Sequence, residues 1–244
     1  NYPPNGSTGI ETNPTLNITV TDDDGDDMNV TFYDASDDSE IDTITGVVNG
    51  SYATYEWSGL NESTTYNWYA TADDGTSTTT SDTWEFTTSK KIDSCMNITL
   101  PGYYMLNQSI NYTKGDACIT IKSDNVTLDG NNKIIKHFNE NNSIAVWSLN
   151  SNLILKNLIV EGNLSNDNDV AHYIDMAYDP NPELNNIKIK NNTFINTSRT
   201  LYFYPYTALD TVNNNDSASF NFYQRYNNTK IQDNKFLNTV SGSV

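Results

Sequence analysis

Basic residues are scarce in this chain, and their scarcity excludes one large class of partner. The sequence holds 13 Lys and Arg against 31 Asp and Glu, a formal net charge of −18 over 244 residues. Only Arg199 and Arg225 are arginines. Because binding to phosphate backbones needs clustered cationic side chains, we expect no nucleic-acid partner.

Long apolar runs are also missing. No segment approaches the roughly 20 apolar residues that a membrane helix needs, and no signal peptide is visible. Apolar content is low at 36%, but 16 Tyr with many Thr, Val and Ile suit pleated surfaces. We expect a folded chain without a membrane span, either matured by removal of an export signal or excised from a longer protein.

Motifs for catalysis are few. The two histidines, His137 and His172, have no Ser/His/Asp pattern around them, and the chain contains no Cys-x-x-Cys pair and no phosphate-binding loop. We interpret both histidines as ordinary surface or packing residues. The sequence therefore predicts a protein that is not an enzyme, with no catalytic residue assigned and no certain cofactor.

The chain has only two cysteines, Cys95 and Cys118. In an exported protein the default is a disulfide between them, and two buried free thiols are the alternative. A disulfide would close a loop of about 23 residues and contribute roughly 3 kcal/mol.

What the sequence has in abundance is Asn-x-Ser/Thr acceptor triplets, here called sequons. There are fifteen, and each marks a surface position where an exported protein can carry an N-glycan. We predict covalent N-glycans at fourteen of these residues: Asn5, Asn17, Asn29, Asn49, Asn61, Asn97, Asn107, Asn111, Asn125, Asn141, Asn163, Asn196, Asn215 and Asn227. Polar and apolar residues alternate around Asn17, Asn29, Asn97 and Asn125, so these four should lie on solvent faces of strands.

Residues 1–89 predict an antiparallel β-sandwich. Alternating segments at 15–21, 28–34, 51–57, 65–72 and 83–87 are separated by turn signals at 22–27, 37–42, 59–62 and 73–76. The region resembles the fibronectin-III or immunoglobulin-like modules of archaeal and bacterial surface proteins. The resemblance rests on PPNG at 3–6, TDDDGD at 21–26, VTFY at 30–33, WSGL at 57–60, TYNWY at 65–69 and WEFTT at 84–88. Such modules serve as spacers and adhesive units.

After a short linker at 90–94, residues 95–244 contain an approximate repeat. It reads NVTLDG at 125–130, NLILKNL at 152–158, NIKIKNNTFIN at 186–196 and KIQDNKFLN at 230–238. Aligning Leu128, Leu155, Ile189 and Ile231 gives steps of 27, 34 and 42 residues. Repeats with growing insertions predict a solenoid.

Short apolar strands that end in Asn fit a right-handed parallel β-helix, in which Asn tolerates left-handed turns and bonds to the next coil. The segment resembles the family of pectate-lyase-like and NosD-like surface proteins. Cys95, PGYY at 101–104, CITI at 118–121 and LDG at 128–130 resemble that family's first coil and cap. Either Asn191 or Asn192 should be the buried ladder residue of such turns. If it is Asn191, its sequon should stay unmodified, and we leave Asn191 out of the predicted glycan sites.

The acidic loop at 22–27 is the best place for a metal. Clustered carboxylates around a Gly turn can supply the oxygens that calcium needs, so we consider calcium at Asp22, Asp24 and Asp26. The spacing does not match an EF-hand, and a solvated acidic turn is the favoured alternative.

Two Tyr/Phe-rich insertions are a further interface prediction, because aromatic side chains are enriched where proteins meet partners. The alternative is that they cover the long coil to which they belong. The residues are Tyr202, Tyr204, Tyr206, Phe222, Tyr223 and Tyr226. Residues after Asn238 suggest no cap, so we expect either that the native protein continues or that the open coil end stacks on another subunit.

Taken together, the sequence predicts an all-β, extracellular glycoprotein of an archaeal-type cell surface. We expect it to assemble with copies of itself into a layer, sheath or filament. A polysaccharide-binding or polysaccharide-cleaving β-helix protein is the alternative, with Asp167, Asp169 and Asp175 beside His172 as acid–base residues. The clustered Asp and Gly-His-Gly motifs of polygalacturonases are absent. Adhesion to other cells is a third hypothesis.

Overall fold

A computed structural model gives the fold of this chain. It describes residues 1–113, 117–137, 144–162, 172–176, 184–196, 201–203, 211–213, 220–221, 226–227 and 229–237. Side chains are not described at 137, 172–176, 184, 201–203, 211–213, 220–221 and 226–227. The described residues form strands and turns without a helix, and the chain divides into two compact units, Asn1–Lys90 and Lys91–Val244.

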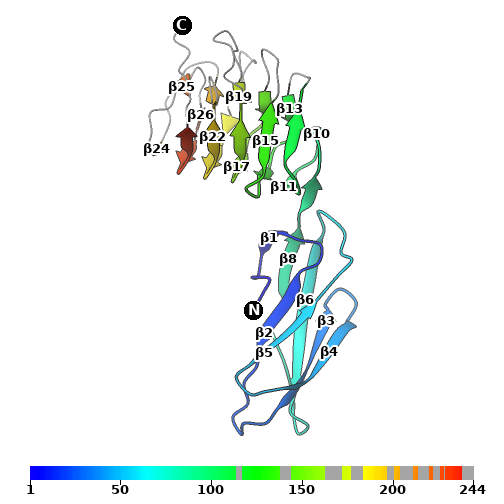
Figure 1. Ribbon diagram of the computed structural model, residues 1–244. Coiled ribbons are helices and arrows are strands. Elements are labelled where there is room, and N and C mark those ends of the chain that lie inside the picture. The colour runs from blue at the N-terminus through cyan, green and yellow to red at the C-terminus, as the bar shows by residue number, and fades with distance from the viewer. Residues whose placement is uncertain are drawn as a thin grey trace. The chain divides into compact units, whose positions relative to one another are not determined.

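The first unit contains eight strands (Figure 1). They are β1 (Ser7–Ile10), β2 (Thr15–Thr19), β3 (Met28–Asp34), β4 (Ser39–Val47), β5 (Tyr52–Glu56), β6 (Thr65–Asp73), β7 (Thr78–Thr80) and β8 (Trp84–Thr88). One sheet has the order β1-β8-β6-β3-β4, with β7 also paired to β6, and β2 and β5 form a second sheet. The pairs are antiparallel except β1 with β8, which is parallel.

The two sheets of the first unit share one core. Leu16 of β2 and Ala53 of β5 are fully buried in the same cluster as Phe32, Trp68 and Phe86 of the larger sheet. Alternation explains this packing, because every second side chain of β3 and β6 points inward. A core between two sheets is consistent with the predicted sandwich.

One strand of the first unit contradicts the sequence prediction. The turn expected at 37–42 ends early, because β4 begins at Ser39 and pairs with β3. Its side chains are mostly exposed or half-buried, since β4 lies at the edge of the sheet. An edge strand needs few apolar residues, and the polar sequence therefore looked like a turn.

The second unit consists mainly of three parallel sheets, named here by their first-coil strands (Figure 1). The β10 sheet contains β10 (Met96–Ile98), β13 (Ala117–Ile121), β16 (Ile144–Ser148), β19 (His172–Met176), β23 (Leu201–Phe203) and β25 (Phe220–Asn221). The β11 sheet has the order β24 (Thr211–Asn213), β27 (Lys230–Gln232), β21 (Lys188–Lys190), β17 (Ile154–Lys156), β14 (Val126–Asp129), β11 (Gly102–Leu106) and β9 (Lys90–Ile92). The β12 sheet contains β12 (Ile110–Tyr112), β15 (Ile134–His137), β18 (Ile159–Glu161), β22 (Thr193–Ile195) and β28 (Lys235–Leu237). A short pair joins β20 (Leu184–Asn185) to β26 (Tyr226–Asn227).

The strand register confirms the predicted repeat. Leu128 pairs with Leu155, Leu155 with Ile189, and Ile189 with Ile231, in the alignment expected from sequence. The chain visits the three sheets in turn, as in β13, β14 and β15 and again in β16, β17 and β18. All three sheets contribute to one buried hydrophobic cluster. Parallel sheets wrapped around one core are consistent with a β-helix.

Asparagines make the turns of this stack, and they form two ladders. The outer ladder consists of Asn125, Asn152 and Asn186, which are exposed, have positive φ, and are joined by Nδ2-to-Oδ1 hydrogen bonds of 3.0 and 2.8 Å. The inner ladder consists of the buried Asn192 and Asn234, joined at 3.0 Å. Asn tolerates the left-handed region better than most residues, which explains the outer ladder. In the inner ladder the left-handed residues are the preceding Asn191 and Asp233, and Asn192 and Asn234 bond the coils from inside.

At the end of the stack, one sheet gains a strand that the repeat pattern does not predict. In the β11 sheet, β24 pairs with β27 on the side away from β21, although β24 comes earlier in sequence. Strand β24 thus covers one strand edge that the sequence pattern leaves open, whereas the residues after 237, on which the expectation of an uncapped end rests, lie outside the described part. In the β12 sheet, β28 is the last strand among the described residues.

Candidate functional site: the outer faces of the second unit

A row of lysines lies on the outer face of the β11 sheet. In β21 and β27, Ile189 and Ile231 are buried, so the alternating Lys188, Lys190 and Lys230 point outward and are exposed. Register places Lys188 beside Lys230 and Lys190 beside Lys156. We call Lys156, Lys188, Lys190 and Lys230 the lysine face.

An anchored ion pair lies at one end of this face. Lys156 Nζ is 3.1 Å from Asp129 Oδ2 and 5.0 Å from the centre of the Tyr103 ring. Tyr103 Oη donates a hydrogen bond to Asp129 Oδ2, and Asn157 Nδ2 donates to Oδ1 at 3.0 Å. Asp129 therefore neutralises Lys156, while the exposed lysines of β21 and β27 project beyond it.

Hydrogen bonds decide the charge states of this cluster. Burial alone would raise the pKa of Asp129, but the bonds it accepts, first from Tyr103 and then from the Asn131 N–H, Asn157 and Lys156, outweigh burial and lower that pKa. Burial would lower the pKa of Lys156, but its bonds to Tyr103 and Asp129 raise it. Burial and then Asp129 raise the pKa of Tyr103. Lysine and aspartate are thus both charged, which suits a structural anchor.

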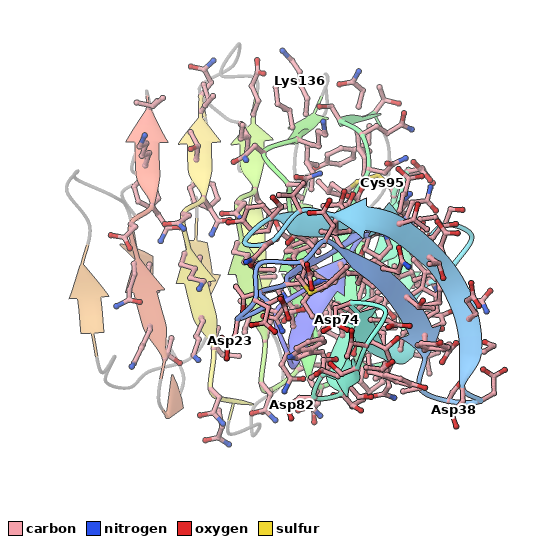
Figure 2. All side chains as sticks on the ribbon, turned by 90° about the horizontal axis from the view of Figure 1, so that it is seen from below. Asp23, Asp38, Asp74, Asp82, Cys95 and Lys136 are labelled. Atoms are coloured by element: carbon pink, nitrogen blue, oxygen red, sulfur yellow. A yellow bond between two sulfur atoms is a disulfide. The ribbon has the colours of Figure 1, made fainter. Side chains whose placement is uncertain are left out.

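Charge is distributed very unevenly between the two units. Residues 1–90 contain 17 acidic side chains and a single basic one, Lys90, for a formal charge of −16. Residues 91–244 contain 14 acidic and 12 basic side chains, for a formal charge of −2. Figure 2 labels Asp23, Asp38, Asp74 and Asp82 of the first unit, of which Asp74 is half-buried and the other three are exposed. The first unit is a polyanion, and the lysine face belongs to the second.

The acidic loop at 22–27 does not assemble the predicted calcium ligands. Asp22 Oδ1 accepts the backbone N–H groups of Asp24 and Asp26, both at 3.0 Å. This carboxylate therefore stabilises its own turn. Among the described residues, no group of three or more His, Cys, Asp or Glu could hold a metal ion. The alternative of a solvated acidic turn fits this geometry.

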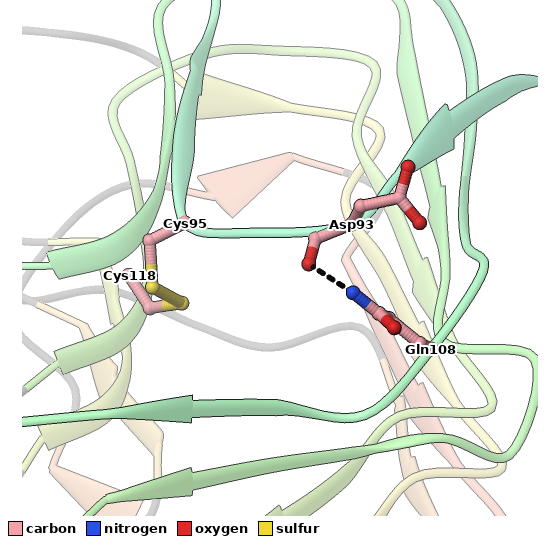
Figure 3. Close-up of a disulfide and its surroundings, with 4 residues drawn as sticks. All are labelled: Asp93, Cys95, Gln108 and Cys118. Carbon is pink, nitrogen blue, oxygen red and sulfur yellow. Dashed lines mark hydrogen bonds between the residues drawn. A yellow bond between two sulfur atoms is a disulfide. The ribbon is translucent and has the colours of Figure 1, made fainter.

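Cys95 and Cys118 form the predicted disulfide, with Cα atoms 4.5 Å apart (Figure 3). Met96 pairs with Ile119, so the two cysteines are neighbours in register between β10 and β13. Beside them, Gln108 Nε2 donates to the Asp93 carbonyl at 2.9 Å. The disulfide fastens the edge strand β10 to β13 of the next coil.

Most described sequons are open to solvent. Asn29 and Asn97 are exposed on strand faces as predicted, while Asn17 is half-buried. Asn125 is exposed too, but it lies in the left-handed turn before β14 and not on a strand face, so that part of the prediction is wrong. The others that are exposed are Asn5, Asn61, Asn107, Asn111 and Asn191. Asn49 and Asn196 are half-buried, and Asn141, Asn163, Asn215 and the side chain of Asn227 lie outside the description. Occupancy of these sites stays a prediction.

The acceptor atom Nδ2 has a competing role at two sequons. Asn49 holds the backbone of Asp22 from both sides, with Oδ1 accepting its N–H at 3.1 Å and Nδ2 donating to its carbonyl at 2.9 Å. Asn107 Nδ2 donates to Asp93 Oδ1 at 2.7 Å. A glycan takes one hydrogen of Nδ2, so these two positions are structurally more constrained than Asn97 or Asn111.

The reason given for leaving out Asn191 is wrong. The buried ladder residue is its neighbour Asn192, whereas Asn191 is exposed with φ 54°. The turn places one residue in the left-handed region outside and the next one inside. Sequence alone could not say which of two adjacent asparagines occupies which position.

The other predicted site residues fall largely outside the described part. Tyr204, Tyr206, Phe222, Tyr223, Asp167 and Asp169 lie outside it altogether. For Tyr202 in β23, Tyr226 in β26, His172 and Asp175 in β19, and His137 in β15, only the strand backbone is described. The aromatic-interface and acid–base predictions therefore stay predictions.

Two features of the second unit escaped sequence reasoning. The alternation Lys-Ile-Lys at 188–190 hinted at an outward lysine pair, but its continuation by Lys230 needs the coil register. The second feature is a hollow of about 480 Å³ on the outer face of the β10 sheet. It is lined by Asn97, Ala117, Thr120, Lys122, Ile144 and Trp147.

Comparison with known proteins gives no relative. No protein-family model, no curated protein and no solved structure matches this chain. Within the described ranges, no helix has the length and apolar character to cross a membrane.

Proposed function

We propose that this chain is an exported, N-glycosylated structural protein that assembles with copies of itself into a cell-surface layer, sheath or extracellular filament. In this proposal the first unit is an antiparallel β-sandwich that acts as spacer or docking module. The second is a right-handed parallel β-helix that acts as the rigid body. The shared core of two sheets in the first unit and the three parallel sheets in the second support this division.

The uneven charge carries the assembly part of the proposal. A first unit with formal charge −16 and a lysine face on the second unit are complementary surfaces of the same chain. Complementary charges steer association and fix its register. A contact between two different surfaces of identical chains repeats head to tail and builds open polymers. The proposed contact is therefore the first unit of one copy on the lysine face of the next.

Sedimentation and negative-stain microscopy of the purified chain test this contact. We expect polymers at about 0.01 M ionic strength that disperse at about 1 M, where the Debye length falls from about 30 Å to about 3 Å. Lys190→Glu should weaken assembly strongly. Lys235→Glu makes the same change in net charge at an exposed lysine of β28, outside the face, and is the matched control.

Monomers at both ionic strengths would contradict self-assembly. Equal effects of Lys190→Glu and Lys235→Glu would contradict the lysine face as its contact. Intact-mass measurement and glycopeptide mapping of protein from a glycosylating host test the export and glycosylation part. A chain with every sequon empty would contradict it.

Saccharide binding is the second candidate function, and the hollow with Trp147 on the β10 sheet favours it. A half-exposed indole offers an apolar face, and polar neighbours can fix a ligand's orientation. Cleavage of a polysaccharide would need two positioned carboxylates. An acidic and neutral glycan panel distinguishes binding from cleavage by whether products are released.

A further inference from the structure

A sequon and an aromatic side chain share one row on the outer face of the β10 sheet. Asn97 of β10 pairs in register with Thr120 of β13, and Thr120 pairs with Trp147 of β16. Residues in register point to the same side of a sheet. The row therefore runs from an exposed asparagine across a half-buried threonine to a half-buried tryptophan.

The spacing in this row suits a sugar chain. Adjacent strands lie about 4.8 Å apart, so the backbones at Asn97 and Trp147 are separated by roughly 10 Å, two strand spacings. The hollow between them holds about 480 Å³. Ligand sites in proteins span about 300 to 1,000 Å³, so the space is adequate for a small oligosaccharide.

The lining has the chemistry that sugars need. Trp147 and Ile144 supply apolar surface for the C–H face of a pyranose ring, and Thr120 and Lys122 supply a hydroxyl and an ammonium for its hydroxyl groups. Ala117 adds a small side chain to the lining. Asn97 lies in the same lining, and its Nδ2 is the atom to which an N-glycan is attached.

We propose that this hollow is a saccharide-binding site whose occupant is the glycan attached to Asn97 of the same chain. The inference rests on the proposed N-glycosylation and adds a place for one glycan to lie. Attachment at the rim makes binding intramolecular, with an effective concentration in the millimolar range. A site that binds a free sugar with a dissociation constant of about 0.1 mM is then occupied about nine-tenths of the time. The docked glycan covers β10, β13 and β16.

Glycosylated protein and three variants test the proposal. Thr99→Ala destroys the sequon of Asn97 but keeps Asn97 itself. Thr113→Ala destroys the sequon of Asn111, an exposed site in β12, and is the matched control. Trp147→Phe identifies the signal, because the fluorescence difference between each protein and its Trp147→Phe version isolates this one of the four tryptophans.

Iodide quenching of Trp147 is the readout. We expect Thr99→Ala to raise the quenching constant severalfold and Thr113→Ala to leave it unchanged, with glycopeptide mapping showing Asn97 occupied in the wild type. Equal quenching in all three proteins would overturn the docking. An empty Asn97 beside other occupied sequons would overturn it as well, while leaving the proposed glycoprotein intact.

A free sugar added to the solution distinguishes the glycan on Asn97 from an external saccharide as the ligand of the hollow. N-acetylglucosamine added to the Thr99→Ala variant should protect Trp147 with a midpoint of about 0.1 mM, about tenfold below the effective concentration of the attached glycan. Protection at micromolar concentration, with wild-type Trp147 as quenchable as in the variant, would identify a site for external saccharides and overturn the Asn97 glycan as occupant.

Discussion

Replacing Asn192 with Leu is the sharpest test of the inner ladder. Asn192 is fully buried. Its Oδ1 accepts the N–H of Leu158 at 2.9 Å, and its Nδ2 donates to the carbonyl of Leu155 at 3.1 Å and to Asn234 Oδ1 at 3.0 Å. Leucine has a similar size and occupies the equivalent turn position one coil earlier, as Leu158. The substitution therefore removes the hydrogen bonds with little change in packing.

The magnitude follows from the groups left behind. Asn234 Oδ1 keeps one donor, because the backbone N–H of Asn192 also bonds to it at 3.0 Å. The N–H of Leu158 loses the acceptor that Asn192 provides, and the carbonyl of Leu155 loses one donor. A buried group left unsatisfied costs about 1 to 3 kcal/mol. We expect Asn192→Leu to lower the free energy of unfolding of the second unit by about 2 to 4 kcal/mol.

Urea unfolding with pulsed hydrogen exchange measures this loss for each unit separately. Peptides from β16 and β17 report the second unit, and peptides from β3 and β6 report the first as an internal control. Asn152→Gly is the matched variant, because glycine keeps the positive φ of this outer-ladder residue while removing its exposed hydrogen bonds. A loss below about 1 kcal/mol for Asn192→Leu, or one equal to that of Asn152→Gly, would refute the reasoning.

Three further predictions concern the same unit. A Cβ on Gly130 would lie 2.4 Å from a backbone oxygen of the next coil, so Gly130→Ala should cost at least about 2 kcal/mol in urea unfolding through overpacking; a neutral result would contradict that contact. Because its folded pKa is lowered, Asp129 contributes stability that is present above its ordinary pKa of about 3.9 and lost as pH falls through the folded value. Asp129→Asn should therefore lower the urea unfolding midpoint at neutral pH and make that midpoint depend less on pH at acid pH. An unchanged dependence of the urea midpoint on pH would contradict the pKa shift. Reduction of the Cys95–Cys118 disulfide should lower the free energy of unfolding of the second unit by about 3 kcal/mol and leave hydrogen exchange in the first unit unchanged. Equal losses in both units would contradict the expectation that the disulfide stabilises only the second unit.

The sequence predicted the repeating part of the second unit well, for a physical reason. A strand of alternating polarity followed by a left-handed turn residue leaves little freedom in register, so Leu128, Leu155, Ile189 and Ile231 could be aligned from their neighbours alone. The disulfide followed from there being only two cysteines.

Features that depend on long-range pairing were not predictable in the same way. The edge strand β4 places Val47, Ile41 and Ile44 against the core, but irregular pairing with β3 breaks their alternation, so the local sequence predicts a turn at its start. The position of β24 beyond β27 reverses the sequence order, and no local pattern encodes such a reversal. The lysine face and the Asn97–Trp147 row also required the register, because their members come from different coils.

The disulfide also determines how the second unit responds to a pulling force. When the chain is pulled from its N-terminal side, tension reaches Cys95 and passes through the sulfur atoms to Cys118, 23 residues further on. The strands between them, β10, β11 and β12, carry no load along the chain. About 80 Å of contour length, at up to about 3.6 Å per residue, stays unavailable for extension until the bond is reduced. A reducing environment would therefore make this protein longer under tension as well as less stable.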